Sequence, residues 1–196
     1  MPLLPASARR ETRWKNGGGS TAEIAVSPEG AGLDDFDWRV SMASIERDGP
    51  FSLFPGVDRV LSVVEAELIL EVFGAPPVTL NLASPPHGFP GDVATFGRLT
   101  GGAVVDVNVM TRRGAFVADV TRVDLNAARE IALRGEALLI VLDGDVDFEA
   151  PESRARLGPR DAWRGEGGLW RLTPSPSARV VMVEFKAVAR VLLSAG

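Results

Sequence analysis

The sequence contains no cysteine and only one histidine, His87, among its 196 residues. The lack of cysteine excludes disulfides, thiolate metal sites and cysteine nucleophiles. A single histidine also excludes a metal centre built from several histidines. No run of ~18 apolar residues is present that could cross a membrane as a helix. We therefore expect no membrane association, no metal site and no cofactor.

The charge is mildly acidic, with 21 Lys and Arg against 26 Asp and Glu and a net charge of -5. The arginines are dispersed, so the basic patch that is typical of nucleic-acid-binding proteins is missing. Residues 1–5 have neither a basic flank nor an apolar core, which predicts that no signal peptide is present and that the protein is cytoplasmic. Hydrophobic residues at 45% and charged residues at 24% are ordinary values for a globular protein.

Short apolar segments bounded by glycine and proline predict β-strands along almost the whole chain. The stretch 84–92 is dense in proline and glycine and predicts a loop that contains His87. Residues 138–148 predict a hairpin with an Asp143-Gly144 turn. One brief helix candidate covers residues 126–130, which is too short to carry the fold. Beyond Val188 we expect a tail. The predicted strands are residues 23–26, 36–45, 58–64, 67–72, 78–82, 96–100, 104–110, 116–123, 170–173 and 179–185.

Two of these strands alternate strictly between apolar and polar residues. Residues 36–45 place Trp38, Val40 and Met42 on one face, opposite a face that carries arginine and serine. Residues 104–110 place Val105, Val107 and Val109 on one face and Asp106, Asn108 and Met110 on the other. Each strand therefore has one apolar face and one face with polar side chains.

The two halves of the chain resemble each other. Residues 98–110 match residues 171–185, and the apolar strand that starts at Leu61 has a counterpart that starts at Leu138. Many short strands with very little helix predict an all-β fold. We predict a duplicated cupin-like jelly roll, or bicupin, with one β-barrel in residues 1–113 and a second in residues 114–196. The second barrel is expected to support the first or to mediate pairing, and Trp163 and Trp170 are expected in its core.

A glycine-rich segment at residues 12–24 has two interpretations. The run Gly17-Gly18-Gly19-Ser20 is typical of a flexible linker. It also suits a sharp turn that mounts Trp14, Lys15 and Asn16 at the rim of a site, directly before a strand. No Gly-Lys-Ser/Thr follows, so the segment is not a phosphate-binding loop.

Five ordered blocks stand out in the first half: residues 14–21 with 23–24, residues 36–41 with 43 and 45, residues 49–56 with 59, residues 89–92, and residues 106–112. Together they resemble the HutD/Ves family of small bacterial two-cupin proteins. The chain departs from the family pattern in two places: Glu65-Ala66-Glu67 replaces a turn that usually contains glycine, and Val107-Asn108 replaces a Phe-Asn pair. The second half matches only as a generic cupin-like barrel.

The resemblance implies more about fold and site than about a reaction. Most cupin enzymes hold a metal with several histidines and a glutamate, which this chain cannot do with His87 alone. HutD proteins accompany histidine-utilisation genes. They are thought to bind an anionic pathway intermediate, such as formylglutamate or urocanate, with a regulatory role, and no catalytic activity is established for the family.

The candidate ligand-binding site consists of polar residues of matching parity on neighbouring strands. A carboxylate suits this set because a guanidinium offers a planar fork, while asparagine and serine fix orientation through neutral hydrogen bonds. In the simpler alternative these side chains face solvent, or Arg39 and Asp106 form a structural ion pair. The predicted site residues are Lys15, Asn16, Arg39, Ser41, Arg59, Asp106 and Asn108.

Three classes of function remain open at this level. The leading hypothesis is a non-catalytic protein that binds a small anionic metabolite. The second is a metal-independent isomerase or hydrolase that uses Asp106 or Lys15 as acid or base, in which case Asp106→Asn abolishes turnover more than affinity. A Ser-His-Asp triad would need His87 and is disfavoured. The third is an interaction protein that pairs through exposed sheet edges into a homodimer and gains no stability from ligands.

Overall fold

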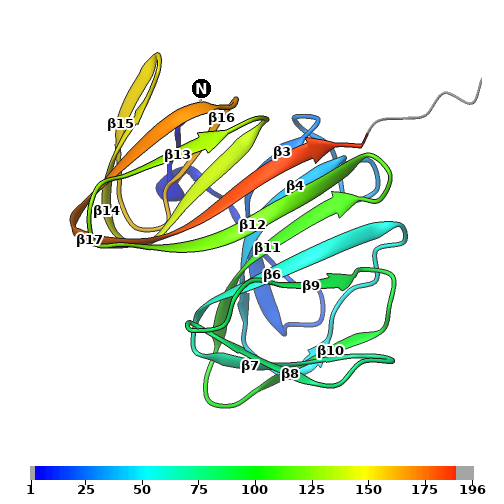
Figure 1. Ribbon diagram of the computed structural model, residues 1–196. Coiled ribbons are helices and arrows are strands. Elements are labelled where there is room, and N and C mark those ends of the chain that lie inside the picture. The colour runs from blue at the N-terminus through cyan, green and yellow to red at the C-terminus, as the bar shows by residue number, and fades with distance from the viewer. Residues whose placement is uncertain (1–2, 189–196) are drawn as a thin grey trace, which may run out of the picture.

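A computed structural model describes residues 3–188, and within them the protein is almost entirely β-structure (Figure 1). The described helical content is one 3-10 turn, η1 (Ala6–Ala8). The strands form three sheets of six, four and seven strands. The predicted all-β fold with very little helix is confirmed. The expected tail beyond Val188 lies outside the described residues.

The six-stranded and four-stranded sheets are both built from residues before position 113. The six-stranded sheet has the order β2-β3-β4-β11-β6-β9, and the four-stranded sheet has the order β5-β10-β7-β8. The strand bounds are β2 (Glu11–Arg13), β3 (Gly19–Ser27), β4 (Trp38–Ile45), β5 (Gly49–Pro50), β6 (Val57–Glu65), β7 (Glu67–Val72), β8 (Val78–Asn81), β9 (His87–Pro90), β10 (Thr95–Leu99) and β11 (Val104–Arg112).

The seven-stranded sheet contains the strands of the second half and one strand from the start of the chain. Its main path is β1-β16-β14-β17-β12, with β13 paired to β17 and β15 paired to β14. Because β1 pairs with β16, the first strand of the chain crosses to the sheet of the second half. The bounds are β1 (Leu3–Leu4), β12 (Phe116–Leu125), β13 (Arg129–Leu133), β14 (Ala137–Ala150), β15 (Ser153–Leu157), β16 (Ala162–Gly165) and β17 (Gly168–Ala187).

The same succession of strand pairs occurs in both halves. In the first half β4 pairs with β11, β11 with β6, and β6 with β9. In the second half β12 pairs with β17, β17 with β14, and β14 with β16. The smaller strands follow the same pattern. In the first half β5 pairs with β10 and β8 pairs with β7. In the second half β13 pairs with β17 and β15 pairs with β14.

The two halves pack together through the apolar faces of β4 and β11. Trp38 is fully buried and stacks on Phe185 of the second half, with ring centroids 4.0 Å apart. Arg122 of β12 reaches into the first half and donates to the Val63 carbonyl at 2.6 Å and to the Leu82 carbonyl at 2.5 Å. Figure 1 shows β4, β11 and β12 lying at this junction. The buried residues of this shared core include Val40, Met42, Val107, Val109, Leu138, Ile140, Val181 and Val183.

The brief helix candidate at residues 126–130 is wrong, because this stretch is a bend that leads into strand β13. Three further sequence-based predictions of local structure are also wrong. Part of the predicted loop 84–92 is strand β9, which pairs with β6, so His87 lies in a strand. The predicted Asp143-Gly144 hairpin turn is a bulge inside the continuous strand β14, whose hairpin partner is β15. The two strands predicted at 170–173 and 179–185 are one strand, β17. In each case cross-strand pairing to a long neighbour outweighs the local turn signal.

The junction of β6 and β7 explains one departure from the family pattern. Ala66 adopts a φ of 62°, a left-handed conformation that favours glycine. The turn is therefore retained although its usual residue is absent. No helix within residues 3–188 is long and apolar enough to cross a membrane.

Candidate functional site

The polar faces of β4 and β11 point toward the four-stranded sheet. We call the side of the six-stranded sheet that faces this second sheet the inner face; it carries Leu61 and Val63 against the buried Leu68 and Leu70. Side chains that oppose one another across paired strands share a face. The predicted polar residues of β4, β6 and β11 therefore lie on the inner face, and the alternative in which they all face solvent is wrong.

Cross-strand register arranges these residues in rows. Across β3, β4 and β11, Glu23 lies opposite Ser41, which lies opposite Asn108. One row further along the strands, Arg39 and Arg59 flank Met110. One row in the other direction, Asp106 lies between Ala43 and Val63. These rows place Ser41, Asn108, Arg59 and Asp106 on one continuous surface.

Arg59 lies at the centre of an aromatic box. Only 5% of the residue is exposed, and its guanidinium carbon lies 5.0 Å from the ring centre of Phe51, 5.8 Å from that of Phe54 and 5.1 Å from that of Phe89. These distances suit cation–π attraction. Its Nε donates to Oδ1 of Asn108 at 3.3 Å. Within residues 3–188, Nη1 and Nη2 have no hydrogen-bond or ion-pair partner, so both ends of the fork are available to a ligand.

Asp106 is the second buried charge of this surface. It is 1% exposed, and its Oδ1 has no hydrogen-bond partner among the described residues. Among the same residues, no ion pair with an N–O distance of 4.0 Å or less joins Asp106 to Arg59 or to Arg39. The alternative in which Arg39 and Asp106 form a structural ion pair is therefore wrong; Arg39 Nε instead lies 2.8 Å from Glu23 Oε2.

Burial and mutual attraction set the ionisation of the two groups. Burial raises the pKa of Asp106 to about 7, against a smaller opposing effect of the Arg59 charge. Burial also lowers the pKa of Arg59 to about 10, an effect that Asp106 opposes and Arg39 reinforces. Arg59 therefore stays cationic at neutral pH, while Asp106 exists in both protonation states.

Two Phe-Pro-Gly loops hold the aromatic box in place. Residues 54–56 carry Phe54, and residues 89–91, which run from the end of β9 into the following loop, carry Phe89. The aliphatic stem of Arg59 lies against Gly91, where a Cβ would come within 3.3 Å of the Arg59 Cγ and Cδ atoms. Glycine at this position therefore leaves room for the arginine stem.

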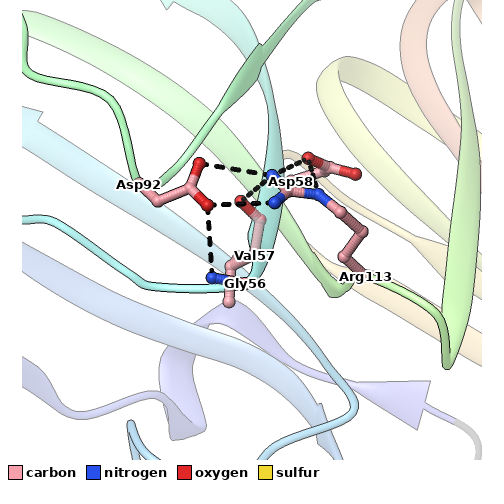
Figure 2. Close-up of polar contacts among 5 residues, drawn as sticks. All are labelled: Gly56, Val57, Asp58, Asp92 and Arg113. Atoms are coloured by element: carbon pink, nitrogen blue, oxygen red, sulfur yellow. Dashed lines mark hydrogen bonds and ion pairs between the residues drawn. The ribbon is translucent and has the colours of Figure 1, made fainter.

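Arg113 connects the two loops, as Figure 2 shows. Its Nη1 donates to Asp92 Oδ2 at 2.9 Å, and its Nη2 donates to Asp58 Oδ1 at 2.6 Å. Asp92 in turn accepts from the Gly56 amide at 3.4 Å. The hydrogen bonds from Arg113 lower the pKa of Asp92. This surface network fixes the loops from outside while Arg59 occupies the space between their phenylalanines.

Lys15 and Asn16 lie in the exposed turn between β2 and β3. The Asn16 side chain accepts from the Gly18 amide at 2.9 Å and so stabilises this turn. Gly17 has a φ of 67°, and a Cβ on Gly19 would collide with the Ser44 carbonyl oxygen. The segment is a tight hairpin turn rather than a flexible linker. A part for these two residues in ligand binding remains a prediction.

Sequence reasoning missed the aromatic box, the Arg113 network and the position of His87. The repeated Phe-Pro-Gly motif was the available signal for the box. His87 lies opposite Leu61 and has the same parity on β9 as the buried Phe89, so it belongs to the inner face. The arginine network carries no comparable sequence signal, because Asp58, Asp92 and Arg113 are far apart in the chain.

The inner face of the second half is filled by apolar side chains. As expected, Trp163 and Trp170 belong to this core, and both pack against Phe148, with ring centroids 4.6 Å and 5.1 Å apart. Its buried cluster of fourteen residues contains only aliphatic, aromatic and methionine side chains. A group of charged side chains lies on β12 and β17. Lys186 Nζ lies 3.3 Å from Asp119 Oδ2 and 3.8 Å from Glu184 Oε2.

Two open clefts lie elsewhere on the molecule. One of about 580 Å³ lies between β3 and β16 and is lined by Glu23, Glu136 and Arg164, among others. Arg164 fills part of it, bonded to Glu136 at 2.7 Å and lying 4.7 Å from the Trp38 ring centre. The other, of about 780 Å³, lies between residues 82–86 and β12. Neither cleft contains the buried groups that lie around Arg59.

Comparison with known proteins agrees with this architecture. The model of the HutD family matches residues 6–182. The chain belongs to the HutD family. Over 185 residues it is 33% identical to an uncharacterised 21.2 kDa protein in the hutC 3' region of Pseudomonas putida, covering 94% of this chain and 96% of that protein. It is also 42% identical over 113 residues to protein Ves of Citrobacter koseri, covering 57% of this chain and 58% of Ves. The resemblance to the HutD/Ves family is confirmed.

Solved structures share the fold of this HutD-family protein. HutD from Pseudomonas fluorescens SBW25 superimposes with a TM-score of 0.81 at 27% identity, covering 95% of this chain and 98% of that chain. A cupin 2 conserved barrel domain protein from Leptotrichia buccalis shares only the fold, with a TM-score of 0.57 at 9% identity, covering 85% of this chain and 88% of that one.

Proposed function

We propose that this HutD-family protein binds a small carboxylate on the inner face of its first half. The observation that carries the proposal is Arg59, a nearly buried guanidinium whose Nη1 and Nη2 have no partner among the described residues. A buried cation without a direct counter-ion is costly, and a carboxylate that accepts two parallel hydrogen bonds removes that cost. Asn108 and Ser41 supply neutral hydrogen-bonding groups beside it.

Carboxylates of increasing size are candidates for the ligand. Formate is the smallest carboxylate, and N-formylglutamate and urocanate carry the same group on larger scaffolds. We propose a metabolite of this kind, with a regulatory rather than catalytic role in histidine utilisation, as the natural ligand. Lys15, Asn16 and Arg39 are proposed as further contacts for its outer part.

We also propose that the fold is a duplicated cupin in which residues 1–113 hold the site and residues 114–196 support it or pair two copies into a homodimer. The matching succession of strand pairs in the two halves supports this duplication. The apolar interior of the second half supports a structural role for it. Sedimentation of the purified protein at several concentrations tests the homodimer directly.

The experiment for ligand binding is thermal unfolding with formate, N-formylglutamate, urocanate and acetate. A bound ligand at a hundredfold excess over its dissociation constant stabilises the protein by about 2.7 kcal/mol. Arg59→Met should abolish the shift. The matched control is Arg98→Met, because Arg98 also lies over a phenylalanine, Phe96 at 5.1 Å, but is exposed on β10. No shift with any carboxylate, or a shift that Arg59→Met retains, contradicts the proposal.

The second candidate is a metal-independent isomerase or hydrolase acting on such a ligand. One observation favours it: a buried carboxyl whose pKa is raised to about 7 can act as a general acid or base at neutral pH. NMR spectra of each stabilising ligand, recorded over hours with the protein, test this candidate. Conversion that Asp106→Asn removes, without loss of the thermal shift, would replace binding by catalysis as the function.

A further inference from the structure

Within residues 3–188, no basic side chain forms a direct ion pair with Asp106. In register it lies between Ala43 and Val63, and its Oδ1 has no partner among the described residues. The Arg59 Nε donates to Asn108, which lies one row away from Asp106 on β11. Asn108 therefore separates the two buried charges, and the guanidinium ends stay unpaired.

The other charged groups on the inner face are few. Arg39 from β4 is already paired with Glu23 from β3. His87 from β9 shares the face of Phe89. The inner faces of β7, β8 and β10 carry Leu68, Leu70, Leu80, Thr95, Gly97 and Leu99, none of which titrates, and β5 consists of Gly49 and Pro50. Asp106, Arg59, Arg39, Glu23 and His87 are thus the groups that decide the charge of this space.

We propose that the site takes up a carboxylate together with one proton, which Asp106 holds. In the empty site, ionised Asp106 is the counter-charge of Arg59. When a carboxylate accepts from the two Nη groups, it takes over that role, and Asp106 gains a proton from solvent on one of its oxygens. No covalent bond to the ligand forms or breaks. This inference rests on the proposed carboxylate site.

The physical reason is the repulsion between two carboxylates near a single cation in a space of low dielectric. Two such groups cannot both stay ionised without a large cost, so the pKa of one rises. The protonated Asp106 also offers an O–H donor to the site, whereas the ionised form only accepts. Burial already raises the pKa of Asp106 to about 7, so the proton costs little near neutral pH.

The proposal specifies the ligand class more narrowly. When Asp106 is neutral, the single positive charge of Arg59 can balance one negative charge of the ligand. The buried end of the ligand should therefore be a carboxylate monoanion. A dianionic group at the same place, such as the doubly ionised form of inorganic phosphate, would leave one charge unpaired in a desolvated space.

Titration calorimetry with sodium formate from pH 6 to 8.5 tests the linkage. Formate stays ionised over this range, because simple carboxyl groups have pKa values of about 4. Above the Asp106 pKa, the affinity of the native protein should fall by about tenfold per pH unit. Repeating the titration at pH 8 in two buffers of different ionisation enthalpy should show uptake of about one proton per formate bound.

Two variants identify the group that holds the proton. Asp106→Asn keeps the shape and adds a neutral donor, so its affinity for formate should be nearly constant from pH 6 to 8.5. His87→Gln is the matched control, because His87 is the histidine on the same inner face. It should retain the pH dependence of the native protein.

The outcomes separate the inference from the proposed site. Formate binding with no proton uptake and a flat pH profile overturns the proton linkage and leaves the carboxylate site standing. A pH dependence that His87→Gln abolishes and Asp106→Asn retains overturns the role of Asp106. No formate binding at any pH overturns the proposed site, and the linkage with it. The proton count of the native protein decides the question even if Asp106→Asn does not fold.

Discussion

The two halves of the molecule share a succession of strand pairs and differ in what they enclose. The inner face of the first half carries Arg59, Asp106 and Asn108 among apolar side chains. The corresponding space in the second half is a continuous cluster around Phe148, Trp163 and Trp170. The same pattern of hydrogen bonds therefore supports two kinds of interior.

The difference bears on how much each half contributes to stability. A buried ion pair without direct contact stabilises a fold less than apolar residues of the same volume. The first half buries the charges of Arg59 and Asp106 without direct contact, whereas every residue that is buried between positions 114 and 188 is apolar. The second half and the shared core around Trp38 can supply the stability that the first half gives up. Matched substitutions in the two halves should therefore differ in their effects on stability and on ligand binding.

The largest expected effect comes from removing one phenylalanine in each half. Phe148→Ala should lower the free energy of unfolding by about 3–5 kcal/mol, because Phe148 is 1% exposed between two tryptophans. Phe89→Ala should cost less stability but abolish carboxylate binding, since Phe89 faces the Arg59 guanidinium. Urea denaturation and ligand-induced thermal shifts measure both. Equal losses of stability, with binding intact in Phe89→Ala, would break the comparison.

The next effect concerns the pH dependence of stability without ligand. The pKa of Asp106 is about 7 in the folded protein and about 4 in an unfolded chain, so the folded state holds the proton more tightly. The contribution of this group is complete below pH ~4 and is lost as pH rises to ~7. Relative to Asp106→Asn, the native protein should lose roughly 2–4 kcal/mol between pH 4 and 8.

A control from the second half accompanies this measurement. Asp119 is exposed and pairs with Lys186 at 3.3 Å, so Asp119→Asn should leave the pH profile between 5 and 8 nearly unchanged. Urea denaturation at several pH values gives the profiles. If Asp106→Asn and the native protein change in parallel over this range, the carboxyl does not titrate near neutrality.

Much of this architecture is predictable from local pattern. Strict alternation in residues 38–45 and 104–110 identifies both faces of β4 and β11, and hence which side chains share a surface. Punctuation by glycine and proline gives most strand boundaries. Parity predicts that Ser41 shares a face with Arg39, and Asp106 with Asn108, because parity is a property of each strand and survives folding. It does not predict that these faces point inward, which the pairing and burial of the strands decide.

Pairing and long-range charge contacts are not predictable in this way. Asp143-Gly144 has the composition of a turn, yet β17 pairs on both sides of it and keeps β14 continuous. Arg39 was expected near Asp106, but Glu23 on the adjacent strand lies closer. The partners of Arg113 are 55 and 21 residues away in sequence, so no local signal indicates the network. Such contacts depend on which strands become neighbours.

A smaller effect tests one turn in each half. Ala66 at the junction of β6 and β7 and Gly144 at the bulge of β14 occupy comparable places and both have positive φ, 62° and 76°. Ala66→Gly should stabilise the protein by about 1 kcal/mol. Gly144→Ala should destabilise it by more than this, because its Cβ would collide with the Ser177 carbonyl oxygen. Ala132→Gly, at an exposed position of β13, is the control and should destabilise slightly, as urea denaturation can show.

The smallest expected effect is that of the external network that holds the aromatic box. Arg113→Gln removes the ion pairs to Asp58 and Asp92, which are solvent-exposed and screened by salt, so overall stability should change little. The loops with Phe54 and Phe89 would then hold Arg59 less firmly, and formate affinity should fall by about threefold at low salt, since ordering the loops costs binding energy. Because salt weakens the same ion pairs in the native protein, the difference between the two proteins should shrink as salt is raised.

Arg156→Gln, which removes exposed ion pairs to Asp145 and Asp147 in the second half, should leave formate affinity unchanged at any salt concentration. If both variants bind formate like the native protein at low salt, the box is held by its own packing, and the contrast between the halves lies in their interiors alone.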